Sequence, residues 1–378
     1  MIVKLGDVAS ERCEIFKGCK QGLPIVGLEH IVPEELLLFD WDVNIDNTFT
    51  KMFRKGQILF GRRRAYLKKA AVAPFDGICS GDITVIEAQS DKLLPDLLPF
   101  IIQNDSFFDF AVEKSAGSLS PRVKWTHLSK FEFNLPSLPE QRKLASLLLA
   151  AISTREAYKK LLTLTDELIK SQFIELFGDP MTNEKAFPLT ALKNCCIINP
   201  RKSGDERLSD ELAVSFVPMA SVSEKGVVDL SEIRQYSDVR SGFTYFSDND
   251  VLFAKITPCM ENGKGAIMQG LTNGIGFGST EFHVLRPIEG ISDPCWIYQI
   301  LAFEKFRKDA AAHMTGSAGQ RRVPVSYLEN YVIGLPPIKL QKRFADFVRI
   351  TDKSKFALQR AIDELDAAYK VILREKLG

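Results

Sequence analysis

The sequence lacks the residue patterns from which most enzyme sites are built. Only 4 of its 378 residues are histidines, and none stands at metal-ligand spacing from another histidine or from a cysteine, which disfavours a zinc site. No G-x-x-x-x-G-K-[ST] phosphate loop is present, because Gly263-Lys264 is followed by another glycine. The Asn/Asp-Pro-Pro-aromatic stretch of an adenine methyltransferase is also missing. We therefore expect neither a catalytic residue nor a metal ion on this chain.

The chain also lacks long apolar runs and paired-cysteine motifs. No apolar run reaches the ~18 residues that a membrane-spanning helix needs, and residues 1–4 do not resemble the start of a signal peptide. The 7 cysteines are odd in number and never form C-x-x-C, which is typical of free thiols in a reducing compartment. We expect a cytoplasmic protein with no membrane partner. The net charge of +1 neither requires nor excludes a nucleic-acid partner.

One long stretch contains neither glycine nor proline, and it occurs twice. Residues 141–177 follow a proline-locked segment and end at Gly178-Asp179-Pro180, a typical helix stop. At ~1.5 Å per residue, such a helix is about 55 Å long. Leu335-Pro336-Pro337 opens a second stretch, 341–377, and Gly378 ends it, so the same landmarks recur 200 residues later. The sequence thus predicts two copies of a unit, each a domain followed by a long helix.

Both long stretches carry apolar residues in alternating steps of four and three, which indicates a coiled-coil seam. Arg155 and Lys355 interrupt this pattern at matching positions. Two such helices can bury their seams by packing together, and an antiparallel pairing relates the two units by a pseudo-twofold axis. The predicted seam consists of Leu144, Leu148, Tyr158, Leu162 and Ile169 in the first stretch and of Phe344, Val348, Leu358, Ile362 and Tyr369 in the second.

Away from the seam, the first helix has charged and apolar positions. The charged residues Arg155, Glu156, Lys159 and Lys160 are expected to be solvated. The apolar residues outside the seam indicate that further helices pack there, and partner subunits are the natural candidates. These residues are Leu147, Leu161, Leu164, Leu168 and Phe173.

The sequence between the long helices predicts mixed α/β domains. In the first domain, strands are expected at 56–61, 70–73 and 83–86 and a helix over 97–112, with a mainly antiparallel, barrel-like sheet. The second domain repeats this order, with a helix over about 293–313. The expected fold class is α+β, with two similar domains and a pair of long antiparallel coiled-coil helices between them. The predicted boundaries are 1–137 for the first domain, 138–178 for the first helix, 179–337 for the second domain and 338–378 for the second helix.

Residues 51–69 give the strongest positive signal for a binding site, because they hold eight basic residues and no acidic one. Arg62, Arg63 and Arg64 follow a predicted strand, and arginine forks match phosphate oxygens and the O6/N7 edge of guanine. This predicts a DNA-reading hairpin. A solvated basic strand edge explains the same residues, and on this stretch alone both interpretations stay open. A glycine-containing loop at 115–118 is also surrounded by basic residues, which favours DNA.

The corresponding hairpin and loop of the second domain also carry basic and polar residues. This repetition favours DNA binding in both domains. The residues at the loop tips differ between the two domains, so we expect each domain to read different bases. The candidate DNA-binding residues are Arg62, Arg63, Arg64, Tyr66, Lys68, Lys69, Arg122 and Lys124 in the first domain, and Lys255, Thr257, Lys264, Gln320, Arg321 and Arg322 in the second.

Several motifs together resemble the specificity (S) subunits of type I restriction-modification systems. They are Leu138-Pro139-Glu140-Gln141 at the start of the first helix, residues 171–179 (SQFIELFGD) at its end, and the hairpin at 60–67 (FGRRRAYL). Gly316-Ser317 through Arg321 and Leu335-Pro336-Pro337 match as well. The resemblance covers essentially the whole chain, including its duplication.

This resemblance implies a non-catalytic, sequence-specific DNA-binding subunit. Each of two target-recognition domains would read one half of a split site on double-stranded DNA, while the helices set the spacing between the halves, roughly one turn of DNA or ~34 Å. Two methylation subunits would dock on the chain, and restriction motor subunits would join them. S-adenosylmethionine, ATP and Mg would bind those partners, and no cofactor would bind this chain. One departure, Ile338-Lys339-Leu340-Gln341, lacks the Pro-Glu of the first helix and predicts a slightly different start or partner contact for the second.

A protein of another class remains as the alternative, namely a coiled-coil adaptor that binds only protein. The basic hairpin at 51–69 and its counterpart in the second domain argue against it. A self-contained methyltransferase is disfavoured by the missing motifs.

Overall fold

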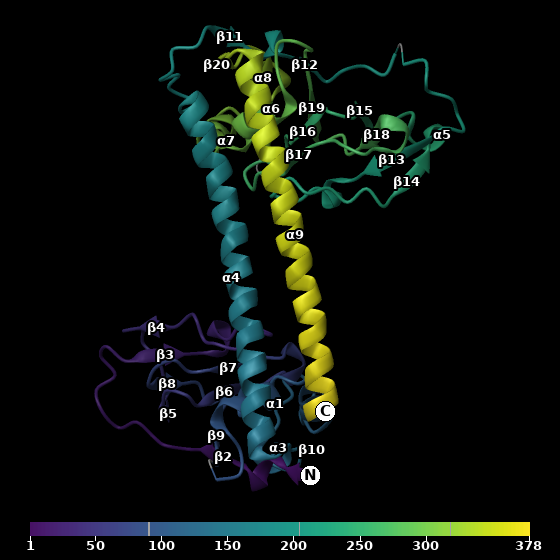
Figure 1. Cartoon of the computed structure of the whole chain (residues 1–378). Coiled ribbons are helices and arrows are strands. Elements are labelled where there is room, and N and C mark those ends of the chain that lie inside the picture. Colours follow the sequence, from purple (N-terminus) through teal and green to yellow (C-terminus); the bar gives the residue numbers. More distant parts are fainter. Residues whose placement is uncertain (90, 204, 318) are drawn as a thin grey trace. The chain divides into compact units, whose positions relative to one another are not determined.

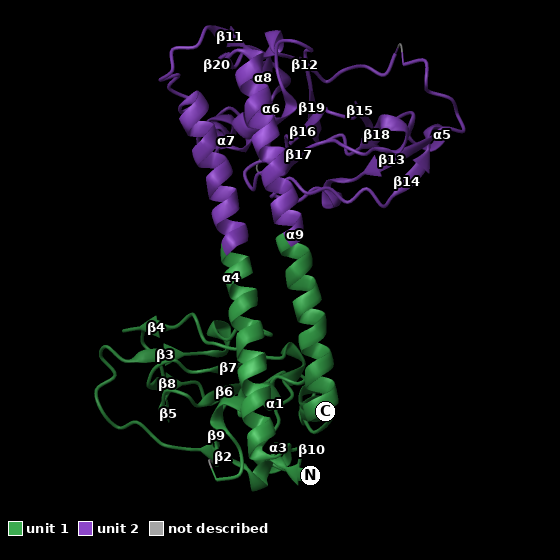
Figure 2. Ribbon diagram, viewed as in Figure 1, with its two compact units in different colours: residues 1–160, 358–378 green, residues 161–357 purple. Residues whose placement is uncertain are grey.

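The computed structural model describes residues 1–89, 91–203, 205–317 and 319–378 (Figure 1). The chain forms two compact units (Figure 2). Unit 1 consists of residues 1–160 and 358–378, and unit 2 consists of residues 161–357. Each unit contains two four-stranded sheets, short helices and part of both long helices. The division between the units therefore falls inside the long helices, whereas the predicted domain boundaries lie at the helix ends.

The two long helices, α4 (Leu138–Phe177) and α9 (Ile338–Leu377), have 40 residues each and begin 200 positions apart. The second helix therefore does not start differently, while a different partner contact, the other half of that prediction, stays a prediction. Only the chemistry of the first turn differs. The Glu140 carboxylate accepts hydrogen bonds from the Ser137 backbone N (2.9 Å) and Oγ (2.7 Å), which hold the pKa of Glu140 below its usual value. Leu340 occupies the corresponding place in α9 and cannot accept them.

A buried glutamine ties each long helix to the domain of its own unit. In unit 1, Gln141 Oε1 accepts from the Leu94 N–H (2.8 Å), and Nε2 donates to two backbone carbonyls at 3.1 and 3.0 Å. In unit 2, Gln341 Oε1 accepts from the Asp293 N–H (2.9 Å), and Nε2 again donates to two carbonyls, at 3.0 and 2.8 Å. Both side chains are at most 1% exposed. In both units, the glutamine at the start of the long helix thus binds the helix to neighbouring backbone segments through three hydrogen bonds.

Unit 1 has two four-stranded sheets, in the strand orders β2-β9-β6-β7 and β4-β3-β8-β5, and a separate two-stranded ladder β1-β10. All pairs are antiparallel except β3 with β8. The strands are β1 (Ile2–Lys4), β2 (Ala9–Arg12), β3 (Pro24–Val26), β4 (Asp42–Val43), β5 (Lys51–Phe53), β6 (Ile58–Gly61), β7 (Ala70–Val72), β8 (Gly77–Cys79), β9 (Ile83–Ala88) and β10 (Glu132–Asn134), and the short helices are α1 (Leu98–Ile102), α2 (Asp105–Glu113) and α3 (Trp125–Leu128).

The two sheets of unit 1 share one apolar core. Val26 and Phe53 of one sheet and Leu59 and Val85 of the other lie in it and are fully buried. The expectation of one barrel-like sheet is therefore wrong. Strands β3, β4, β5 and β8 have only two or three residues each, and such short strands show no alternation in the sequence.

Helices α1 and α2 cover the other face of the β6–β9 sheet. The rings of Phe60 on β6 and Phe107 on α2 make an edge-to-face contact with centroids 5.5 Å apart. The single helix expected over 97–112 is in fact two helices. Asn104 is extended and caps α2, accepting from the Ser106 N–H (3.3 Å).

Unit 2 repeats this topology strand for strand, with sheets β12-β19-β16-β17 and β14-β13-β18-β15, the ladder β11-β20, and a parallel pair between β13 and β18. The helix expected over 293–313 also breaks, because Phe303 is extended. The strands are β11 (Leu189–Ala191), β12 (Cys196–Ile198), β13 (Ala213–Val217), β14 (Ile233–Gln235), β15 (Thr244–Ser247), β16 (Val251–Ala254), β17 (Gly265–Ile267), β18 (Ile275–Gly278), β19 (Phe282–Pro287) and β20 (Val332–Gly334), and the short helices are α5 (Tyr236–Val239), α6 (Pro294–Ala302), α7 (Glu304–Ala312) and α8 (Val325–Asn330).

Within each unit the two long helices run antiparallel. In unit 1, Leu148 of α4 shares a core with Leu373 of α9, and Arg155 reaches Asp366 (Nη1 to Oδ1, 3.5 Å). In unit 2, the rings of Phe173 and Phe344 lie 5.4 Å apart, and Lys355 binds Asp166 at 2.6 Å. None of the ten predicted seam residues is exposed. Leu144, Leu148, Ile169, Phe344 and Ile362 are buried, and Tyr158, Leu162, Val348, Leu358 and Tyr369 are half-buried.

Two expectations for the outer faces of the helices are wrong. Arg155 is not solvated, since its side chain is only 13% exposed and it forms ion pairs with Glu35, Glu156 and Asp366 inside unit 1. Phe173 is not a surplus apolar residue on the surface but is fully buried in the core of unit 2. The arginine is held by carboxylates from a loop and from the second helix, which the helix periodicity alone does not reveal.

Candidate nucleic-acid interface

The arginine tract after β6 is only partly available to a ligand. Arg63 donates from Nε to Ser120 Oγ (2.9 Å) and forms an ion pair with Asp82 (3.5 Å). Arg62 is half-buried, and its backbone N–H donates to the Asp82 carbonyl (2.9 Å). Arg64 is exposed and has a left-handed backbone conformation (φ 54°). Of the three, Arg64 is therefore placed best for contact with DNA.

Arg122 links the glycine loop of unit 1 to the turn before β9. Its Nε donates to Asp82 Oδ1 at 2.7 Å, and this hydrogen bond with its charge holds the pKa of Asp82 below the ordinary value. Its backbone exchanges two hydrogen bonds with Ala116. Gly117, between them, has φ 114°, a conformation that favours glycine. This arginine holds the loop in place.

Arg322 repeats this arrangement in unit 2. Its Nε and Nη2 donate to the two carboxylate oxygens of Glu281, at 2.9 and 2.8 Å, and the bonds lower the pKa of Glu281. Its backbone pairs with Thr315, and Gly316 has φ 115°. The neighbouring Arg321 donates from Nη2 to the carbonyls of Ala311 (2.9 Å) and Met314, at the end of α7. Both arginines of this loop are therefore used within the fold.

The other predicted contact residues fall into two groups. The first group is bound within its own unit: Lys68 pairs with Asp105, Lys69 donates to the Leu28 carbonyl (2.6 Å), Lys264 donates to the Met219 carbonyl (3.2 Å), and Thr257 donates to Glu261 (2.9 Å). The second group presents its side chains to solvent or to a hollow. It consists of Tyr66, Lys124, Lys255 and Gln320.

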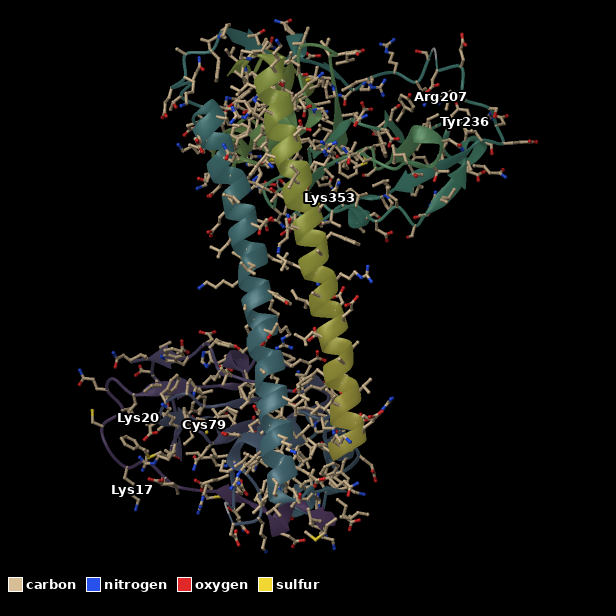
Figure 3. All side chains as sticks on the ribbon, viewed as in Figure 1. Lys17, Lys20, Cys79, Arg207, Tyr236 and Lys353 are labelled. Carbon is tan, nitrogen blue, oxygen red and sulfur yellow. The ribbon has the colours of Figure 1, made fainter. Side chains whose placement is uncertain are left out.

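A hollow of about 540 Å³ lies beside the Asp82 turn of unit 1. Its charged lining residues are Glu14, Lys51 and Asp82, and each is neutralised by a neighbour: Glu14 by Arg54 (2.7 Å), Lys51 by Glu11 (3.2 Å), and Asp82 by Arg122. Lys17 and Lys20 lie on the loop that follows β2 (Figure 3). The remaining lining residues are Cys13, Ile15, Thr48, Phe49, Thr50, Ser80 and Gly81.

A second hollow, of about 480 Å³, lies at the corresponding place in unit 2. Both hollows are formed by the segment after the first strand of the helix-covered sheet (β2, β12), by an edge strand of the other sheet (β5, β15), and by the turn before β9 or β19. Four of the lining residues are basic and none is acidic: Arg201, Lys202, Arg240 and Lys255. The others are Asn199, Pro200, Ser203, Phe243, Thr244, Tyr245, Thr280 and Phe282.

A neutral histidine supports one wall of the unit 2 hollow. His283 is 5% exposed, and its Nε2 lies 2.8 Å from the Val323 carbonyl, which can only accept, so Nε2 carries the proton. Its Nδ1 then accepts from Asn199 Nδ2 (3.1 Å), while Asn199 Oδ1 accepts from the Val284 N–H (3.0 Å). Burial lowers the pKa of His283, which favours the neutral ring. Asn199 is thereby fixed at the edge of the hollow.

Sequence reasoning found Lys255 but missed Arg201, Lys202 and Arg240. The dipeptide Arg201-Lys202 follows the short strand β12 in the same way as residues 13–15 follow β2, and this correspondence between the units marks its place. Arg240 lies on a connection after α5 and has no counterpart in the sequence of the first unit that could have marked it. Arg207 and Tyr236, in the same part of unit 2, are seen in Figure 3.

Outside residues 90, 204 and 318, the chain shows no group of three His, Cys, Asp or Glu side chains that could hold a metal ion. Over the same residues, none of the helices combines the length and the apolar character that crossing a membrane requires.

The chain is similar in sequence to subunits of one class. It is 38% identical over 201 residues to the EcoAI type I restriction enzyme specificity subunit of Escherichia coli, and 37% identical over 202 residues to the EcoEI specificity subunit of the same organism. Each match covers 50% of this chain and 33% of the relative, so a third of the relatives' length is matched. No protein-family model matches the chain.

The fold is similar over the whole chain. A type I restriction-modification S subunit from M. genitalium superposes with a TM-score of 0.59 at 11% identity, covering 100% of this chain and 96% of that one. A chain from a structure of type I restriction-modification complex assembly gives a TM-score of 0.55 at 17% identity, covering 100% and 97%. The resemblance in motifs is therefore confirmed: half of this chain is similar in sequence to type I specificity subunits, and all of it shares their α+β fold.

Proposed function

We propose that this chain is the DNA-specificity subunit of a type I restriction-modification complex. The observation that carries the proposal is the repetition of one architecture twice in a single chain, with the same strand order and a hollow at the same position in each unit. Two similar domains that differ in the residues of these hollows suit a split site whose halves have different sequences. The chain itself would be non-catalytic, and double-stranded DNA would be its ligand.

In this proposal the DNA-reading surface of each unit is the hollow and the exposed residues around it. Four candidate residues are exposed, Arg64, Tyr66 and Lys124 in unit 1 and Gln320 in unit 2. Their guanidinium, phenol, ammonium and amide groups are of the kinds that contact base edges and phosphates. The paired arginines Arg122 and Arg322 would instead fix the loops on which such residues stand. Specificity then depends on loop shape as much as on residue type.

The outer face of α4 supports the docking of partner subunits. Leu147, Leu161, Leu164 and Leu168 are 54%, 45%, 47% and 52% exposed, and exposed leucines of this number along one helix are typical of protein interfaces. We propose that two methylation subunits bind the long helices and that restriction motor subunits join them. S-adenosylmethionine, ATP and Mg would bind those partners in the cytoplasm, and this chain would bind no cofactor.

The test is DNA binding by the full chain together with its methylation subunits, followed by methylation profiling of a host genome that expresses the complex. We expect tight binding to one bipartite sequence and adenine methylation at that sequence alone. The methylation subunits without this chain serve as the control and should show no preference. A complex that assembles but binds all duplexes equally would contradict the proposal and support a protein-binding adaptor.

A further inference from the structure

The hollow of unit 2 combines concave shape with positive charge. Arg201, Lys202, Arg240 and Lys255 line it from three separate segments, and no acidic residue is among the lining side chains. A concave surface lined by charges of one sign concentrates the electric field and attracts ligands of opposite charge. Hydroxyl groups of Ser203, Thr244 and Thr280 on the same surface can donate to anionic oxygens.

Two of these cations are free to bind a ligand. Within the described part of unit 2, no ion pair or side-chain hydrogen bond engages Arg201, which is exposed, or Lys255, which is half-buried at the end of β16. Arg240 pairs with Asp210 at 3.3 Å, but both side chains are more than half exposed, so the pair is weak. Lys202 donates to the Arg240 carbonyl and lies 5.4 Å from the ring centre of Tyr236, which orders it at the rim.

The hollow of unit 1 lacks this property although it lies at the same place in the fold. Its charged residues Glu14, Lys51 and Asp82 are all paired with neighbours of opposite charge. Two of the three are acids, which repel phosphate, and the one cation, Lys51, is bound to Glu11 (3.2 Å) and to the Ile83 carbonyl (3.0 Å). The two hollows therefore offer a DNA duplex different kinds of contact.

We propose that the hollow of unit 2 binds phosphates of the DNA backbone through Arg201 and Lys255, with Lys202 and Arg240 at its rim, and that this hollow supplies more of the salt-dependent affinity than the hollow of unit 1. The inference rests on the proposed function, since it takes duplex DNA as the ligand. Phosphate contacts release counterions, and each lowers the slope of log K against log salt by about 0.9. The hollow of unit 1 contributes little to that slope, and its unit contacts DNA through the exposed residues of the hairpin.

The experiment measures affinity for a duplex at several salt concentrations, with the full chain bound to its methylation subunits. R201Q, K255Q and the double variant are compared with the parent, with K51Q in the unit 1 hollow, and with K353Q on α9 as a control of equal charge change. We expect the slope to become less negative by about 1 for each single variant and by about 2 for the double variant. Binding to cognate and non-cognate duplex should weaken in the same proportion, and K51Q and K353Q should keep the parental slope.

Three results would overturn the inference while leaving the proposed function intact. They are a parental slope in the double variant, an equal loss of slope in K51Q, and a loss confined to the cognate sequence, which would indicate a base contact. Melting temperature and methylation-subunit binding identify any variant that fails to fold. K255M, which also removes the charge, then serves in place of K255Q and should show the same change of slope, whereas K255R, which keeps the charge, should retain the parental slope. If the parental complex has no sequence preference at all, the proposed function fails instead.

Discussion

Asp82 in unit 1 and Glu281 in unit 2 stand at the same turn, and each binds the arginine of its glycine loop. The hollow beside that turn has paired charges in unit 1 but four cations and no acid in unit 2. The two arginines that recur in the glycine loops thus hold those loops, while most of the residues that line the hollows differ between the units. In a duplicated DNA reader with two different half-sites, the contacts that read bases should be found among the differences.

The recurrence of basic residues in both glycine loops has a second explanation in the structure. Arg122 and Arg322 are the recurrent ones, and both are bound to carboxylates within their own units. A residue needed to fix a loop is retained in both copies because both copies need the loop. The predictions below test this division between holding and reading residues, from the largest expected effect to the smallest.

The largest effect is expected in the shared part of the fold, the helix seam. Leu148 is fully buried in the core of unit 1, and Leu148→Asp places an unpaired charge there, which typically costs roughly 3–5 kcal/mol of unfolding free energy. Val348→Asp, at the matching but half-buried position of unit 2, should cost less. Urea denaturation measures both.

Leu147→Asp is the control for this pair, since Leu147 is 54% exposed. It should leave stability nearly unchanged and weaken methylation-subunit binding. Equal destabilisation by Leu147→Asp and Leu148→Asp would contradict the assignment of the two faces of α4.

The buried glutamines should behave alike in the two units. Gln141→Ala and Gln341→Ala each leave a backbone N–H and two carbonyls without their partner, at a cost of about 1–3 kcal/mol. Hydrogen exchange at the Leu94 and Asp293 amides should accelerate in the respective variant. Gln359→Ala, on the exposed face of α9, is the control and should stay within about 0.5 kcal/mol of the parent. If only one of the two variants lost stability, the two glutamines would not have equivalent roles.

Among the reading residues, Arg64 should affect only one half-site. Arg64→Asn keeps a residue that tolerates the left-handed backbone (φ 54°) and removes the fork. If Arg64 contacts a base, discrimination at one position of the first half-site should fall by about 1–3 kcal/mol, with the second half-site unchanged. Arg64→Lys keeps charge but loses bidentate geometry. Titration against single-base variants of the site measures both, and parental specificity in Arg64→Asn would exclude a base contact.

Sequence alone predicted the duplication, the long helices and their seam, because proline, glycine and heptad spacing act locally. It did not predict the second sheet of unit 1, whose strands have only two or three residues and are too short to alternate, nor the second sheet of unit 2, nor the helix breaks at Asn104 and Phe303. In the candidate site it identified basic residues but not which of them are paired. The partners Asp82 and Glu281 are about 40 residues from Arg122 and Arg322, and such pairings arise only from tertiary structure.

The smallest effect is a shift in pH dependence from the loop-holding pairs. Arg122 lowers the folded-state pKa of Asp82, so the pair stabilises unit 1 above the ordinary aspartate pKa of about 3.9 and this contribution disappears as pH falls through the folded-state value. Arg122→Ala should therefore lower the melting temperature at pH 7, and the difference from the parent should shrink below about pH 4. Arg322→Ala should show the same behaviour in unit 2, beginning at slightly higher pH, since its partner Glu281 has an ordinary pKa near 4.3. In an Asp82→Asn background, Arg122→Ala should add no further pH dependence. A difference that persists unchanged to pH 3 would mean that the arginine holds the loop through packing and backbone contacts, not through its charge.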